Sequence, residues 1–96
     1  MYVVAAQYTV KEGNEKQVID ILKKMIPISR AEPGCRFYSV NQSSDNPRKL
    51  LLYEQYANKA GYEAHMATDA FKEHILGKVV PMLETRERVF YETVEP

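Results

Sequence analysis

The histidine in the middle of the chain, His65, is the side chain best suited to proton transfer, because an imidazole has an unperturbed pKa of about 6.5. It stands in the segment YEAHMATDAF, residues 62–71, between Ala64 and Met66. Two interpretations fit these neighbours. His65 could be a general base or hydrogen-bond donor in a pocket, or a half-buried imidazole that bridges locally. The choice between them depends on the elements that position it.

Glu54 is the second candidate for proton chemistry, near the end of an apolar and aromatic stretch that closes at Tyr56. A carboxylate buried in such surroundings needs a partner. It could orient His65 or bind a substrate hydroxyl. Alternatively, it could form an ion pair with an arginine such as Arg86 or Arg88.

The other reactive residue types favour structural roles. Cys35 is the single cysteine, so no internal disulfide can form, and we expect a small buried side chain. A nucleophilic thiol would need a lowered pKa, and only Arg36 is near in sequence. His65, Asp69 and Glu73 follow i, i+4 steps that could hold a metal. An exposed charged helix face gives the same pattern, so we expect no metal.

Size and charge restrict the class of protein. The chain has 96 residues, which fits one domain over residues 1–96. Thirteen basic side chains balance thirteen acidic ones, whereas nucleic-acid binders usually carry a basic excess. No apolar run is long enough to span a bilayer, and no charged-then-apolar leader opens the chain. We therefore expect a cytoplasmic protein that binds neither nucleic acid nor membrane.

Alternation of β-branched and aromatic residues predicts strands, and apolar spacing of three and four predicts helices between them. The predicted strands cover residues 2–10, 35–42, 49–56 and 85–94.

Capping and breaking residues place the ends of the first helix. Asn14 is the expected N-cap, with Gln17 in the capping-box position. Pro27 is expected to kink or end this helix, and Pro33-Gly34 to end the segment.

The second helix has its own start, break and stop signals. Asn58 is the expected N-cap of this helix. Thr68 and Asp69 resemble a fresh cap that interrupts it, and Gly77 and Pro81 are expected to stop it. The same face of the helix should carry Tyr62, His65 and Met66.

The order βαββαβ predicts an α+β, ferredoxin-like fold, with one antiparallel sheet and both helices on one of its faces. The other face would carry large side chains such as Leu51, Tyr53 and Tyr38 into water. The chain has seven Tyr and no Trp, and Tyr suits interfaces because its ring is apolar and its tip polar. An exposed patch of this kind usually marks an interface, so we expect a homodimer formed through the sheet faces.

Three segments of the chain read EPGCRFYSV at 32–40, LLYEQY at 51–56 and AHMATDAF at 64–71. Together they resemble the antibiotic biosynthesis monooxygenase domain family. The resemblance covers nearly the whole chain, and the order and spacing of the segments also match. It implies a dimeric α+β barrel, with a pocket between the sheet and the helices of each subunit.

The resemblance also implies a choice of chemistries. Several members of the family look like oxygenases of phenols and quinols that use neither metal nor flavin. Other members are isomerases of a small phosphorylated signalling sugar, and others break down haem. The haem-degrading branch resembles a site with Trp, a first-strand Asn and His. This chain has no Trp, and its first strand reads AAQY in that region, which argues against haem degradation.

The leading hypothesis is a cofactor-free, quinol-type monooxygenase that uses dioxygen as co-substrate. In it, His65, carried over from the Ala-His motif, and Glu54 are catalytic. The expected substrate-binding residues are Tyr53, Tyr56, Met66, Phe71 and Ile75. The alternatives are an isomerase of a small phosphorylated sugar-like molecule and a non-catalytic dimer that binds a small aromatic. RNA binding fits poorly, because KLLLYEQY lacks the Gly-aromatic pattern of RNA-recognition motifs.

Overall fold

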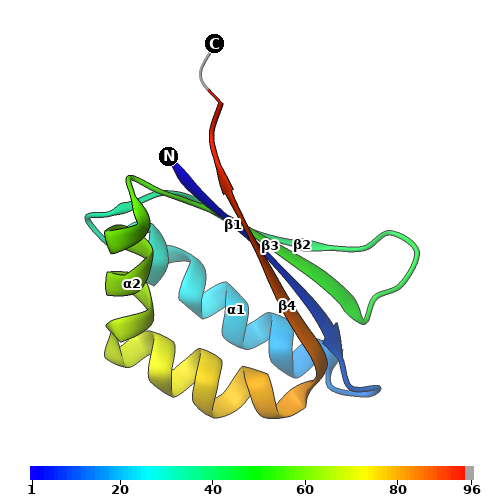
Figure 1. Ribbon diagram of the computed structural model, residues 1–96. Coiled ribbons are helices and arrows are strands. Elements are labelled where there is room, and N and C mark those ends of the chain that lie inside the picture. The colour runs from blue at the N-terminus through cyan, green and yellow to red at the C-terminus, as the bar shows by residue number, and fades with distance from the viewer. Residues whose placement is uncertain (95–96) are drawn as a thin grey trace.

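The computed structural model describes residues 1–94 and contains one four-stranded antiparallel sheet with the helices packed on one face (Figure 1). The strand order is β2-β3-β1-β4, which confirms the ferredoxin-like α+β fold. In chain order the elements are β1 (Tyr2–Val10), α1 (Glu15–Arg30), β2 (Cys35–Gln42), β3 (Lys49–Tyr56), α2 (Lys59–Ala67), the π-helix η1 (Phe71–Val79), the 3-10 turn η2 (Val80–Met82) and β4 (Leu83–Glu92).

Alternation along β3 decides which side chains face the helices. Leu50, Leu52, Glu54 and Tyr56 are buried on that side, and Tyr53 points to the opposite face. Successive strand residues point to opposite faces of a sheet, so Glu54 shares its face with Tyr56. The antiparallel pairing of β3 with β1 sets Glu54 opposite Val4.

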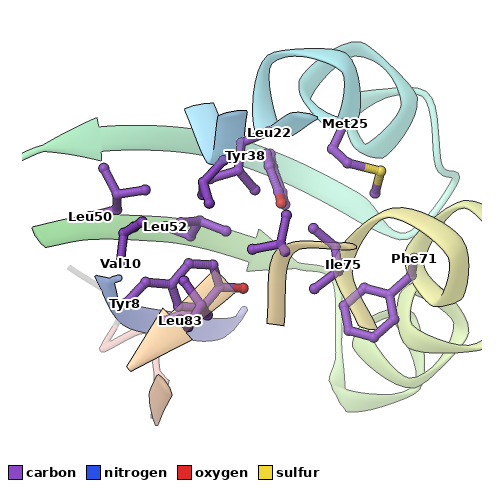
Figure 2. Close-up of a cluster of buried hydrophobic side chains, with 13 residues drawn as sticks. Tyr8, Val10, Leu22, Met25, Tyr38, Leu50, Leu52, Phe71, Ile75 and Leu83 are labelled. Atoms are coloured by element: carbon purple, nitrogen blue, oxygen red, sulfur yellow. The ribbon is translucent and has the colours of Figure 1, made fainter. Parts of the chain in front are cut away.

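The main core lies between this face of the sheet, α1 and η1 (Figure 2). Leu22 and Met25 of α1 meet Ile75 of η1 above Tyr38 and Leu52 of the sheet. Fully burying an aliphatic side chain of this size contributes about 1.5–3 kcal/mol. This packing holds the sheet and both helical segments at a set distance from each other.

The first helix differs from the sequence prediction at Pro27 and in the contact made by the Asn14 side chain. The first helix continues past Pro27 to Arg30, because the proline ring removes one donor while its carbonyl still accepts from the Ala31 N–H at 3.1 Å. Asn14 is at the predicted N-cap position, but its side chain forms no capping hydrogen bond. Its Nδ2 instead donates to Gln17 Oε1 at 2.8 Å.

Gly77 does not stop the last helical segment, which runs through it to Val79. Buried Ile75 and Val79 flank it, and their packing outweighs the roughly 1 kcal/mol that glycine costs in a helix. The predicted break at Thr68 is confirmed: its Oγ1 accepts from the Phe71 N–H at 3.1 Å. The cap at Asn58 is also confirmed, since its side chain accepts from the Gly61 N–H at 2.9 Å.

The face of the sheet away from the helices carries exposed apolar side chains. Phe37, Leu51, Val89 and Tyr91 are each between 38% and 54% exposed there. This is the face from which the sequence predicts dimer formation. The prediction that Tyr38 also lies on it is wrong, because Tyr38 pairs with Glu54 and is buried on the helix side of the sheet. Within residues 1–94, no helix has the length and apolar content needed to cross a bilayer.

Candidate functional site

His65 is buried between α2 and the sheet, with 2% of its surface exposed. The cap at Asn58 sets the start of α2, and the inward face of the helix then carries Tyr62 and His65. Four aromatic rings surround the imidazole, with centroids 5.1–6.2 Å away. They belong to Tyr38, Tyr56, Tyr62 and Phe71. The ring is thus turned away from bulk water and held in aromatic surroundings.

Glu32 is the hydrogen-bond partner of His65, and the sequence reasoning did not single it out. Its Oε1 and Oε2 lie 2.8 and 3.1 Å from His65 Nδ1. Glu32 lies in the turn between α1 and β2, 33 residues before the histidine. It opens the segment EPGCRFYSV, so the signal was its place in that motif and not any periodicity.

Glu54 lies on the other side of the imidazole. Its Oε1 accepts a 2.5 Å hydrogen bond from the Tyr56 hydroxyl and is 3.9 Å from His65 Nε2. The latter distance is too long for a hydrogen bond, so Tyr56 orients Glu54 directly and His65 only faces it. In the described residues, neither Arg86 nor Arg88 forms an ion pair with Glu54, although both lower its pKa from a distance.

The buried environment shifts the pKa values of the two groups toward their neutral forms. Burial raises the pKa of Glu54 to about 7, against the opposing effect of the Tyr56 hydrogen bond. Burial lowers the pKa of His65, and the neighbouring Glu32 carboxylate partly opposes this. At neutral pH the imidazole is therefore neutral and Glu54 is close to half protonated.

A neutral imidazole carries one proton, and the contacts assign its position. The Glu32 carboxylate is an acceptor at Nδ1, so Nδ1 carries the hydrogen and Nε2 presents a lone pair toward Glu54. The site therefore combines a free basic nitrogen with a carboxyl group that titrates near neutral pH. This pair can accept and return a proton out of contact with water.

Neither of two hollows has His65 among its lining residues, although Tyr38, whose ring packs beside the imidazole, lines the second. One, of about 480 Å³, is formed by the strand ends, where Gln7, Thr9 and Leu51 are among its lining residues. Another lies beside Arg30 and Phe37. The space next to the imidazole, where the family resemblance implied a pocket, is filled by the four aromatic rings.

The predicted substrate-binding residues fall into two groups. Tyr56 and Phe71 contact the imidazole ring, and half-buried Met66 is on the same helix as His65. Ile75 belongs to the main core, packed in the same cluster as Phe71. Tyr53 is on the opposite face of the sheet, where its ring packs against the edge of another outer-face aromatic, so it does not share a site with His65.

Arg88 closes the outer side of the aromatic cluster. Its Nη1 donates to the Tyr62 hydroxyl at 3.0 Å and lies 3.5 Å from Met66 Sδ. Its guanidinium also sits 5.8 Å from the centre of the Phe90 ring. Tyr62 therefore separates the buried imidazole from a solvent-exposed arginine.

The possible metal pattern does not form a cluster. Glu32 and Glu54 face His65, whereas Glu73 lies 3.5 Å from Nε2 of His74. In the part of the chain that the structure describes, no three His, Cys, Asp or Glu side chains converge on a point that could bind a metal ion.

The sequence of the chain is similar to that of known proteins. A family model described as antibiotic biosynthesis monooxygenase matches residues 1–75. An uncharacterized protein of Synechocystis sp. is 32% identical over 73 residues, which cover 76% of this chain and 50% of that protein. The chain thus spans about half the length of that curated relative.

Solved structures share the whole fold. A candidate antibiotic biosynthesis monooxygenase from Nitrosomonas europaea is 26% identical, with a TM-score of 0.93 over 99% of this chain and 100% of that one. A protein from Shewanella oneidensis is 30% identical, with a TM-score of 0.88 over 94% of this chain and 87% of the other.

Proposed function

Since the chain belongs to the antibiotic biosynthesis monooxygenase family, we propose that it oxidises a small phenol or quinol with dioxygen and uses no metal or organic cofactor. The observation that carries this proposal is the buried imidazole of His65, with a carboxyl group near each ring nitrogen and aromatic rings on its remaining sides. An alternative assignment as a mere core histidine does not account for the buried carboxyl group of Glu54 and the partly buried one of Glu32 at its edges.

The proposed chemistry begins with removal of a phenolic proton. A hydroquinone anion gives an electron to dioxygen far more readily than the neutral molecule does. One oxygen atom then enters the ring and the other leaves as water, while the hydroquinone is converted to a hydroxyquinone. The substrate supplies all the electrons, so the balance requires no external reductant.

His65 and Glu54 have complementary roles in this proposal. A substrate hydroxyl can lie about 2.8 Å from both Nε2 and the facing carboxyl oxygen, because these two atoms are 3.9 Å apart. His65 takes the proton, and Glu54, with its pKa of about 7, accepts or donates the second hydrogen bond. The protonated imidazole later returns the proton to the oxygen that leaves as water.

Substrate entry requires one aromatic side chain to move. Tyr62 stacks on His65 with an interplanar angle of 22°, and its hydroxyl bonds to exposed Arg88. We propose that the substrate ring takes the position of the Tyr62 ring, with Met66, Tyr56 and Phe90 as its neighbours. Because the bound ring excludes water from the site, electron transfer from the substrate anion to dioxygen is favoured.

We also propose that the working form is a homodimer closed through the outer faces of the sheets. The exposed apolar side chains on that face support it, since a patch of large apolar residues is usually covered in the functional assembly. The family resemblance supports the same arrangement. A second sheet over this face would complete an α+β barrel.

Oxygen consumption tests the proposed activity. The protein, checked to be free of metal and flavin, is mixed with a panel of hydroquinones in an oxygen-electrode cell. We expect uptake well above autoxidation for at least one hydroquinone, and a loss of about 100-fold or more for His65→Ala. His74→Ala is the matched control, because His74 belongs to η1 and its ring nitrogen faces exposed Glu73 and not the site around His65, and it should keep the wild-type rate.

Two results would contradict the proposal. Uptake no faster than autoxidation across the panel would exclude the oxygenase, and a His65→Ala variant with the native fold and full rate would exclude the role of the imidazole. Turnover that continues without oxygen would favour an isomerase instead.

A further inference from the structure

We infer that Glu32 is a positioning residue for His65, which holds the hydrogen on Nδ1 and thereby presents Nε2 as the basic nitrogen. The catalytic consequence of this inference rests on the proposed function, but the positioning itself does not. Glu32 contacts neither the substrate position nor Glu54. Its hydrogen bond acts through the imidazole, while its negative charge also helps to raise the pKa of Glu54 from a distance.

The contact geometry supports a directed hydrogen bond. Both carboxyl oxygens of Glu32 lie within 3.1 Å of Nδ1, and the side chain of Glu32 is only 15% exposed. A hydrogen bond between an ionised carboxylate and an N–H is stronger than a neutral one, and it is weakly screened at this depth. The imidazole therefore has a strong acceptor at one nitrogen only.

The backbone fixes Glu32 in this position. Its N–H donates to the Ser29 carbonyl at 3.1 Å, and its own carbonyl accepts from the Cys35 N–H at 3.1 Å. The turn is thus bonded on both sides of the residue, and the carboxylate has few other positions available.

Two glycines bring this turn against the start of α2. A Cβ on Gly34 would lie 2.8 Å from the Cα of Gly61, a separation that only two backbones without side chains can reach. The Gly34 carbonyl also accepts from the Ala57 N–H at 2.9 Å. Because Glu32 precedes this crossing and His65 follows it by one helical turn, the crossing sets the distance between them.

The inference gives Glu32 a defined effect on the proton transfer. When Nε2 takes a proton from the substrate, the imidazole becomes positively charged in a buried place. The Glu32 carboxylate stabilises that charge, and the proton stays on Nε2 until it is returned. Without Glu32, the nearest carboxyl group would be Glu54 on the Nε2 side, and the imidazole hydrogen would move to Nε2.

Other ionisable groups also face the imidazole and must be accounted for in a pH study. They come from the α1–β2 turn, β2, β3 and α2, and they are Glu32, Tyr38, Glu54, Tyr56 and Tyr62. The tyrosines are neutral in the accessible pH range, because burial raises the pKa of each of Tyr38, Tyr56 and Tyr62. Below pH 9, only the two carboxyl groups therefore compete for the imidazole.

Nitrogen NMR of the histidine-labelled protein tests the positioning directly. In the wild type we expect His65 to be in the Nδ1–H form at neutral pH. Glu32→Gln should keep this form, because its amide oxygen can accept, but should lower the His65 pKa since the negative charge is gone. Glu32→Ala should shift the hydrogen toward Nε2. Glu73→Gln, beside His74, is the control and should leave the His65 signals unchanged.

Kinetics on the same variants separate this inference from the proposed function. If the wild type consumes oxygen with a hydroquinone, we expect Glu32→Gln to lower kcat by about tenfold or more and to move the acid limb of the pH profile to lower pH. Unchanged His65 tautomer and pKa in both Glu32 variants would overturn the inference while leaving the oxygenase intact. If the wild type shows no oxygenase activity but the His65 NMR signals change in the Glu32 variants, the positioning role is supported and the oxygenase is excluded.

Discussion

The hydroxyl of Tyr56 donates a 2.5 Å hydrogen bond to Oε1 of Glu54, and both side chains are almost fully buried. The two residues are neighbours on the same face of β3, at positions i and i+2. This bond gives the buried carboxyl group of Glu54 a hydrogen-bond donor. It also sets the carboxyl oxygen that faces the imidazole.

The pKa of Glu54 predicts a pH dependence of stability. The folded value of about 7 lies above the ordinary value of 4.5, so the folded state binds the proton more tightly. The contribution of Glu54 is fully present below about pH 4.5 and is lost as the pH rises through 7. The loss amounts to about 3 kcal/mol at most. His65, whose pKa is lowered, acts in the opposite direction as the pH falls.

Urea unfolding of Glu54→Gln and the wild type between pH 4.5 and 8.5 isolates this effect. The difference in unfolding free energy between the two proteins should shift by about 2–3 kcal/mol in favour of the variant as the pH rises. Parallel curves would show that Glu54 titrates at its ordinary value.

Replacement of Tyr56 by Phe should destabilise the protein by about 1–3 kcal/mol, because the buried carboxyl group of Glu54 loses its donor. The variant should also raise the pKa of Glu54 further. Tyr53→Phe is the matched control: it removes a hydroxyl that accepts from Gln55 on the outer face, and it should cost less than about 0.5 kcal/mol. Equal losses in chemical denaturation would contradict the special role of the Tyr56 bond.

Replacement of Tyr62 by Ala should open a hollow next to His65 with the shape of the lost side chain, which is that of p-cresol. The loss of this buried ring should cost about 3–5 kcal/mol. Saturating p-cresol should restore about 1.4 kcal/mol at tenfold excess over Kd, seen as a rise in Tm. Tyr91→Ala, at a half-exposed outer position, should show no such rescue. A failure of p-cresol to bind Tyr62→Ala would argue against the proposed substrate position.

A charge on the outer sheet face should break the proposed dimer. Leu51→Lys places an ammonium group in the centre of that face, where the partner sheet would bury it without a counter-charge. Sedimentation should then report a monomer. Leu76→Lys is the control, because Leu76 is similarly exposed but belongs to η1. If the wild type itself sediments as a monomer, the dimer proposal is wrong.

Gly34 and Gly61, where the α1–β2 turn crosses the start of α2, should tolerate substitution unequally. Gly34→Ala would drive its methyl group to 2.8 Å from the Gly61 backbone and should cost about 1–3 kcal/mol. Gly61→Ala meets its nearest atom at 3.3 Å and gains helix propensity of up to about 1 kcal/mol, so its net effect should be small. Thermal unfolding of the two variants compares them. A reversed order would mean that the turn shifts without cost.

Local patterns in the sequence were sufficient for the elements and their order. Alternation in YVVAAQYTV and KLLLYEQY predicts strands because a half-buried strand must alternate, and both strands are where they were expected. The same alternation correctly separates Tyr53 from Glu54. Helix ends were less predictable, since Gly77 and Pro27 have breaking tendencies of a few kcal/mol or less that core packing outweighs.

What the sequence by itself determined is the fold class and the shared strand face of Glu54 and Tyr56, because both follow from periodicity along a short segment. The packing of the helices decided which face of that strand is buried. Only the tertiary structure decided that Glu32 is the partner of His65 and that aromatic rings fill the space around it. Those contacts join residues 33 positions apart, across a backbone crossing between two glycines. No local pattern encodes such a contact, because it depends on how the α1–β2 turn and α2 pack in space.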